Sequence, residues 1–172
     1  MKVKLIIGML ASREKMFYDA EKHLESIFGD IDYSSAVLPF TYTDYYENEM
    51  GENLLRKFIA FKRLINPEDI VHAKIETRSI EKLFCCQPGQ RRINIDPGYV
   101  NGAKLVLATT KDYDHRIYLG DGIYAEVTLH FRGETFTPWE WTYPDYRTRE
   151  YIDIFNRIRV IYFQDIKEIE GR

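Results

Sequence analysis

The chain has 172 residues, with 45% hydrophobic and 15% aromatic side chains and a formal net charge of −3. This size suits one domain with a buried core, and the slightly acidic balance makes a nucleic-acid partner an unfavoured reading. No stretch approaches the roughly 18 consecutive apolar residues that cross a bilayer, so we expect no membrane association.

The two cysteines, Cys85 and Cys86, are neighbours in the sequence. Adjacent cysteines rarely bridge each other, and no second pair exists for a disulfide framework or a zinc site. The apolar N-terminal run lacks a small-residue cleavage site and predicts a buried strand rather than a signal peptide. We therefore expect a cytoplasmic protein with a single domain over residues 1–172, divided into an α/β portion over 1–86 and a second portion over 87–172.

Residues 1–40 carry the pattern of a βαβ unit. Apolar runs predict strands over residues 3–9 and 31–40, and apolar residues at helical spacing predict a helix over 13–28 that ends at Gly29. A strand, a helix and a second strand in this order imply a parallel pair with a right-handed crossover.

Residues 41–86 give weaker signals. Residues 41–51 form a polar, acidic and aromatic loop, and the apolar spacing over 52–64 predicts a second helix. Alternation over 70–76 favours a short strand, and Thr77 then caps a helix that reaches residue 84.

Residues 91–131 predict a β-meander, whose register can be chosen by asking which pairing keeps one face apolar. A three-residue loop, Gly120-Asp121-Gly122, satisfies this condition, with Gly122 at positive φ. The expected opposite pairs are Leu119 with Ile123, Ile117 with Ala125, Arg116 with Glu126, Tyr118 with Tyr124, Ile95 with Leu105, Leu107 with Ile117, and Asp96 with Lys104.

A last helix begins at Pro144 or Asp145, and its apolar stripe should pack on the apolar side of the meander. The fold class is thus α/β or α+β. We expect a mixed sheet, built from the N-terminal βαβ portion and the antiparallel meander, with helices packed on one face. Two small subdomains with a cleft near residues 42–51 are the alternative.

The second face of the meander is unusually polar and is either a binding platform or a solvated face. Carboxylates beside histidine and arginine can bind a metal, hold phosphate or move protons. A plain cross-strand pair of Arg116 and Glu126 is the alternative reading. The face carries Asn94, Asp96, Arg116, Glu126 and His130, of which Asp96, Glu126 and His130 are the candidate metal ligands.

The connection over residues 109–116 holds hydroxyl, acidic and basic side chains together. Lys111 as a point charge, Arg116 as a planar fork and Thr110 as a donor suit a phosphate or nucleotide. A solvated hairpin would explain the same residues. Asp112 and His115 add acid–base groups to this segment.

Three further segments are weaker candidates. The turn over residues 8–12 precedes a helix N-terminus but lacks both glycine-rich phosphate-binding patterns. The loop over 41–51, which includes Tyr45, could form an acidic aromatic lip. The segment PWEWTYPDYR places Trp139 and Trp141 on either side of an acid and adds Arg147.

Five segments, LPFTYTDYYENEMG, NIDPGYV, KLVLATTKDYDHRIYL, GIYAEVTL and WTYPDYR, resemble the signature segments of domain of unknown function 4416, a family of small bacterial and archaeal proteins. Some members carry the label GTP-binding protein, but this chain has neither a P-loop nor an NKxD-type motif. Arg78 stands where the resemblance leads us to expect Asn, which puts a site over residues 77–81 in doubt. The positions that the resemblance carries over are Asp44, Tyr45, Glu49, Asp96, Gly98, Tyr99, Thr110, Lys111, Asp112, His115, Arg116, Glu126, Asp145 and Arg147.

These observations lead to two hypotheses. In the first, the protein binds or acts on a small phosphorylated or nucleotide-like ligand at the polar face of residues 91–131, with or without a divalent metal. In the second, it is a non-catalytic interaction or homo-oligomerisation module that uses its Tyr- and Trp-rich segments. In the first hypothesis, Asp96, Asp112, Glu126 and His115 are the catalytic candidates, and Lys111, Arg116, Thr110, Asn94, Tyr45 and Arg147 bind the ligand.

Overall fold

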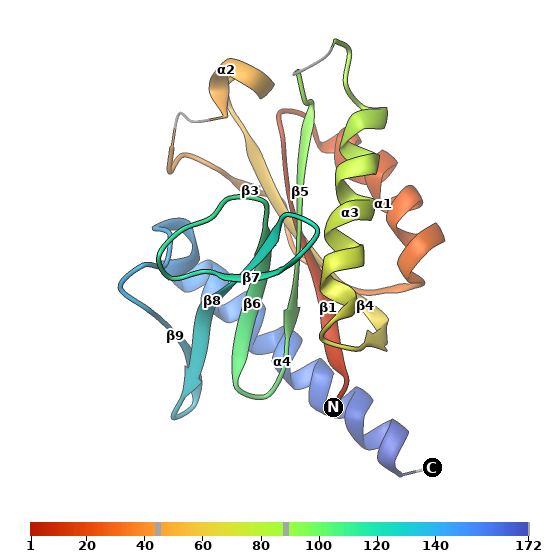
Figure 1. Ribbon diagram of the computed structural model, residues 1–172, viewed down its shortest axis with the longest axis vertical. Helices are drawn as coiled ribbons and strands as arrows, with labels where there is room; N and C mark the ends of the chain where they lie inside the picture. Colours follow the sequence, from red (N-terminus) through yellow and green to blue (C-terminus); the bar gives the residue numbers. More distant parts are fainter. Residues whose placement is uncertain (44–45, 88–89, 172) are drawn as a thin grey trace.

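One large antiparallel sheet forms the centre of the molecule (Figure 1). The computed structural model describes residues 1–43, 46–87 and 90–171. Nine strands in this part of the chain form the sheet, in the order β2-β4-β1-β5-β6-β8-β7, with β3 beside β4 and β9 beside β8. The strands are β1 (Val3–Ala11), β2 (Ile31–Ser34), β3 (Leu38–Pro39), β4 (Leu55–Ile65), β5 (Ile93–Val100), β6 (Lys104–Thr109), β7 (Ile117–Gly120), β8 (Ile123–Arg132) and β9 (Thr135–Pro138).

Helices cover both faces of this sheet, so the fold is α+β as expected, but the expected single helical face is wrong. Two helices, α1 (Glu14–Phe28) and α3 (Asp69–Leu83), lie on one face, and the long helix α4 (Arg149–Glu170) crosses the other (Figure 1). The remaining pieces are the short helix α2 (Glu47–Met50) and the 3-10 turn η1 (Asp145–Arg147). No helix in these described ranges is long and apolar enough to span a bilayer.

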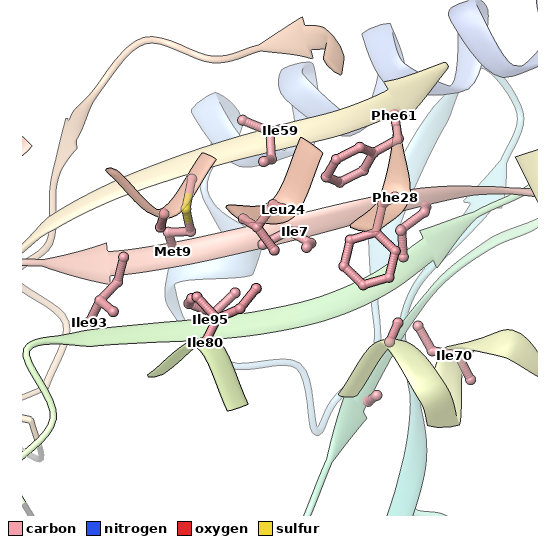
Figure 2. Packing of buried hydrophobic residues seen from close by; sticks show 14 of the residues in the cluster. Ile7, Met9, Leu24, Phe28, Ile59, Phe61, Ile70, Ile80, Ile93 and Ile95 are labelled. Atoms are coloured by element: carbon pink, nitrogen blue, oxygen red, sulfur yellow. The ribbon is translucent and has the colours of Figure 1, made fainter. Parts of the chain in front are cut away.

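The first core lies between the sheet and the pair α1 and α3. Side chains from β1, β4 and β5 meet those of the two helices there, and Figure 2 shows Ile7 and Met9 of β1 at its centre. All nine residues of β1 are buried, because it has a strand on each side and a helical layer on each face. The residues labelled in the figure are Ile7, Met9, Leu24, Phe28, Ile59, Phe61, Ile70, Ile80, Ile93 and Ile95.

The second core lies on the opposite face, under α4. Alternate residues of the same strands point there, since successive side chains of a strand face opposite ways. Ile6 of β1 and Phe58 of β4 pack against Tyr151, Phe155 and Ile158 of α4. A helix on this face is needed because the strands are apolar on both sides.

The expected βαβ unit is wrong. Strands β1 and β2 are not neighbours, because β4 lies between them and is antiparallel to both. The error came from reading residues 52–64 as a helix when β4 occupies most of that range. A strand buried on both faces loses its two-residue alternation, so its apolar run also fits helical spacing.

The opposite error was made over residues 70–76, which belong to helix α3 rather than to a strand. Asp69 helps to begin this helix, since its carboxylate accepts a hydrogen bond from the amide of Asn66 at 2.9 Å. Thr77 lies in the middle of α3 and is not its cap. Its hydroxyl instead donates to the carbonyl of Lys74.

The register of the meander is confirmed in part. Ile117 pairs with Ala125 and Tyr118 with Tyr124, and Gly122 has a φ of 73°. However, Leu119 is bulged out, so that Gly120 rather than Leu119 pairs with Ile123.

The expected pairing between β6 and β7 is wrong, because β6 pairs with β8 instead. The expected register between β5 and β6 is also wrong. Leu107 lies opposite Glu126 rather than Ile117, and Leu105 pairs with Val100 rather than Ile95. Asp96 lies inside β5, opposite Gly8 of β1, and not across from Lys104.

The sheet is open between β5 and β6. The two strands pair only where Gly98–Val100 meet Leu105–Leu107. Pro97, which has no amide hydrogen to donate, stands where the pairing stops. Beyond it the carboxylate of Glu81, from α3, accepts a hydrogen bond from the amide of Ile95 at 2.7 Å. The opening lets side chains of α3 reach the edge of β5.

Candidate functional site

A buried arginine lies on the α4 face of the sheet. Arg56 of β4 is only 4% exposed. Its Nε donates to the hydroxyl of Tyr151 and its Nη2 to Asp145 of η1, both at 3.2 Å. The rings of Phe40 and Phe58 flank the guanidinium at 5.1 and 5.4 Å. Its Nη1 is buried without a hydrogen-bond partner.

Asp96 lies near this arginine on β5. One carboxylate oxygen accepts from Lys74 of α3 at 2.8 Å, and the other accepts from Asn94 at 2.6 Å. Lys74 reaches Asp96 because the sheet is open beside this part of β5. Burial opposes the charge of Asp96, but Lys74 and Arg56 together keep its pKa below the ordinary value, so the group is a carboxylate at neutral pH.

The amide of Asn94 links this pair to a second arginine. The Asn94 side chain accepts a hydrogen bond from Arg91 at 2.8 Å, and Arg91 also binds both oxygens of Glu49 at 2.7 and 2.9 Å. Such two-pronged pairs fix the orientation of the guanidinium. Hydrogen bonds from Arg91 lower the pKa of Glu49.

Arg91 also lines a pocket of about 270 Å³ beside the start of α1. Its wall is largely basic, with Arg13 and Arg92 beside Arg91 and Glu49 as the acidic member. The other lining residues are Ser12, Met16, Met50, Cys86 and Gln90.

Glu126 of β8 organises a further polar cluster. One of its oxygens accepts from Arg116 at 3.0 Å and lies 2.9 Å from Nε2 of His115. Its other oxygen accepts from Thr128 at 3.2 Å. Arg116 also donates to the carbonyl of Lys111 and, at 3.4 Å, to the hydroxyl of Tyr143. The expected cross-strand pair of Arg116 and Glu126 is therefore confirmed.

Charges that act at longer range link the two clusters electrostatically. Burial is the main cause that raises the pKa of Tyr46, but the charges of Asp96, Arg56 and Arg91 also act on it, as does Tyr143. Lys111 contributes to the low pKa of Glu49. The loop over residues 109–116 therefore lies near the β5 cluster.

An aromatic stack borders the Glu126 cluster. His115 stacks on Trp141 with ring centroids 5.4 Å apart, and Trp141 stacks on Trp139 at 5.1 Å. His130 follows at 3.9 Å from Trp139. Trp139 is 36% exposed and Tyr143 is 55% exposed, so the stack reaches the surface.

The proposed metal ligands are not brought together. Asp96 and Glu126 lie on β5 and β8, which β6 separates, so their backbones are about 10 Å or more apart. His130 packs on Trp139 instead. Within the described residues, no three His, Cys, Asp or Glu side chains gather as a metal site requires.

The remaining predicted residues lie in different places. Lys111, His115 and Arg116 gather around Glu126 or beside it. Thr110 and Asp112 are exposed on the same loop. Arg147 serves a structural role, since it donates to the carbonyls of Thr142 and Glu140. Tyr45 and Asp44 lie outside the described residues.

A model of one protein family matches residues 1–162. The chain belongs to the family Domain of unknown function (DUF4416). The resemblance drawn from the five sequence segments is thereby confirmed. No curated protein and no solved structure matches this DUF4416 chain.

Sequence reasoning missed three residues of the candidate site, Arg56, Lys74 and Arg91. Arg56 was hidden because its strand was read as a helix, and Lys74 because its helix was read as a strand. One signal could have found Arg56. The charged pair Arg56 and Lys57 interrupts the apolar run of residues 54–61, and a charge buried within such a run needs a partner, whichever element holds it.

Proposed function

We propose that the protein binds a small phosphorylated or nucleotide-like ligand on the polar face over β5 and β8. The carrying observation is that Lys111 and Arg116 lie on one loop beside Glu126, and that the charge of Lys111 also acts on Glu49, the ion-pair partner of Arg91. These groups come from two segments that are distant in sequence, and Arg suits phosphate because of its planar fork.

The aromatic stack supports the nucleotide-like part of this proposal. Trp139 and Trp141 stack with their planes 14° apart, and Trp139, which lies between Trp141 and His130, is partly exposed. A planar base gains about 1–3 kcal/mol from stacking on such a ring. Exposed Tyr113 and Tyr143 lie around Arg116, so a ring and a phosphate could be held together.

The experiment is a thermal-shift titration with inorganic phosphate, pyrophosphate, AMP and ATP, each with and without Mg²⁺, Mn²⁺ or Zn²⁺. A ligand at 100 times its Kd stabilises by about 2.7 kcal/mol, which raises the Tm by about 5–11 °C for a chain of this size. The metal series tests at the same time whether ligand binding needs a divalent metal.

Lys111→Ala is the decisive variant because Lys111 is exposed and its backbone hydrogen bonds, to Thr109 and Arg116, are kept in alanine. We expect a several-fold weaker affinity for the phosphate-bearing probes. Arg149→Ala is the matched control, since Arg149 is 93% exposed on α4 and lies outside the polar face. A flat screen, or equal losses in both variants, would reject the proposal.

One observation favours the second hypothesis, an interaction surface. Strand β7 is at the edge of the sheet, and three of its apolar side chains are exposed, Ile117 at 68%, Tyr118 at 59% and Leu119 at 41%. An open apolar edge strand commonly pairs with another chain. Light scattering on the wild type and on Ile117→Lys tests this: a dimer that the substitution converts to a monomer would support a β7 interface, and a wild-type monomer would reject it.

The proposed compartment is the cytoplasm, where reducing conditions keep thiols free. Cys85 and Cys86 are free, and Cys86 is exposed. Cell fractionation of a tagged chain tests this assignment, and recovery outside the cytoplasm would contradict it.

A further inference from the structure

The unpaired nitrogen of Arg56 is the starting point. Arg56 is only 4% exposed, and two of its three guanidinium nitrogens have hydrogen-bond partners. The third, Nη1, has none, although it is closed off from solvent. A buried donor on a charged group is costly to leave unsatisfied, so an oxygen that is external to the chain is expected there.

The position of Nη1 is defined by Gly8. Gly8 of β1 pairs with Phe58 on one side and with Asp96 on the other. A methyl group built on Gly8 would lie 3.4 Å from Nη1 and 2.9 Å from the Phe58 ring. The guanidinium therefore lies over the bare backbone of β1, between β4, which carries it, and β5, which carries Asp96.

Asp96 offers the second half of a recognition pair. Its oxygens accept from Lys74 and Asn94, but each carboxylate oxygen has a further lone pair. Its side chain is 30% exposed, so it can be reached from solvent. Asp96 and Arg56 thus lie on the two strands that flank Gly8 of β1, one with an acceptor and the other with a donor.

The local charges select the kind of ligand atom. The positive charges of Arg56 and Lys74 are balanced by Asp96 and Asp145. A phosphate oxygen placed on Nη1 would meet two carboxylates, which disfavours a further anion. A hydroxyl fits better, because its oxygen can accept from Nη1 while its hydrogen is donated to Asp96.

We propose that Arg56 Nη1 and Asp96 together bind a hydroxyl group of the ligand, while Lys111 and Arg116 bind its phosphoryl group. This inference rests on the proposed function and narrows it to hydroxylated phosphates, the chemistry of sugar phosphates and of the ribose phosphate part of nucleotides.

Calorimetry with two probes tests the assignment. Ribose 5-phosphate carries the phosphate and hydroxyls, and pentyl phosphate carries the phosphate alone. We expect wild-type protein to bind ribose 5-phosphate about 10-fold or more tightly than pentyl phosphate, because one hydrogen bond to a charged group provides a difference of this size. Asp96→Asn should remove most of that difference and leave pentyl phosphate unchanged. Asp153→Asn, at an exposed site on α4, is the matched control and should preserve it.

The outcomes separate the two claims. Equal binding of both probes would overturn the hydroxyl site and leave the phosphate proposal standing, whereas binding of neither would overturn both. If Asp96→Asn fails to fold, a crystal structure of the wild type soaked with ribose 5-phosphate decides. A sugar hydroxyl on Nη1 supports the assignment, and a water molecule that remains there overturns it.

Discussion

The ammonium group of Lys4 is a charge placed fully inside the protein. Lys4 is 0% exposed, and its Nζ lies 2.7 Å from Asp32 and 2.7 Å from Asp165 of α4. It also donates to the carbonyl of Phe61 at 3.0 Å. This lysine thereby joins the start of β1 to β4 and to the C-terminal half of α4.

Removing that charge should be strongly destabilising. Lys4→Met would leave two carboxylates facing each other, so we expect a loss of about 3–5 kcal/mol in the free energy of unfolding. Urea denaturation measures it. Lys22→Met is the control, because the Lys22–Asp19 pair is at the surface and should contribute less than about 1 kcal/mol. A similarly small loss of unfolding free energy in both variants would show that the buried ion pairs of Lys4 do not stabilise the fold.

Asp96 should contribute to the pH dependence of the free energy of unfolding at acidic pH. Its folded pKa lies below the ordinary value of 3.8, so its charged form contributes stability above about pH 4, and this contribution is lost as the pH falls through the folded pKa. Asp96→Asn should therefore lower stability at pH 7, and the difference from wild type should shrink below pH 4. Urea midpoints at pH 7 and pH 3 measure it. A constant difference would contradict the assignment.

The site residues were predictable to the extent that neighbours in sequence stay neighbours in space. Arg116 and Glu126 lie on one hairpin, so their pairing followed from alternation alone. Lys74 donates a hydrogen bond to Asp96 across 22 residues of sequence, and the charge of Arg56, which is farther away in sequence, also acts on Asp96. No local pattern encodes such a contact, which depends on the strand order.

At the scale of elements, strand β5 meets β6 along a very short stretch, and a glycine stands there. A methyl group on Gly98 would lie 2.5 Å from the carbonyl oxygen of Val106 and 2.7 Å from the Leu107 side chain. We expect Gly98→Ala to cost about 1–3 kcal/mol, because the backbone of β6 must move. Denaturant unfolding measures this. An unchanged midpoint would mean that β5 and β6 can move apart at this position without a loss of stability.

Amphipathic elements were the ones that the sequence predicted well. Helices α1 and α4 each have one apolar stripe, and the sequence of the β7–β8 hairpin alternates, so all three were found. However, α4 begins at Arg149 rather than at residue 144 or 145, and Leu119 is bulged. Strand β4 failed because both of its faces are buried. The prediction of helix α3 failed because two of its polar residues, Lys74 and Glu81, are buried and form hydrogen bonds to β5.

At the scale of the molecule, two cores share one sheet, and α4 closes the second. Its buried residues include Tyr151, Phe155 and Ile158. A chain ending at residue 148 would expose that core, so we expect it to lose cooperative unfolding and to bind a hydrophobic dye. A chain ending at residue 166 removes residues 167–171, which are exposed, together with residue 172, and should keep both properties near wild type. Circular dichroism with dye fluorescence compares them. Cooperative unfolding of the shorter chain would show that the first core stands alone.

The opening between β5 and β6 has a consequence for hydrogen exchange. Most amides of the sheet are held by carbonyl groups, which do not titrate, but the amide of Ile95 is held by the carboxylate of Glu81. Burial raises the pKa of Glu81. A carboxylate accepts hydrogen bonds more strongly than a carboxylic acid does. Acidification should therefore weaken the protection of Ile95 relative to sheet amides that are bound to carbonyl groups, and the Ile95 amide would report the charge of a helix side chain that lies where β6 no longer pairs with β5.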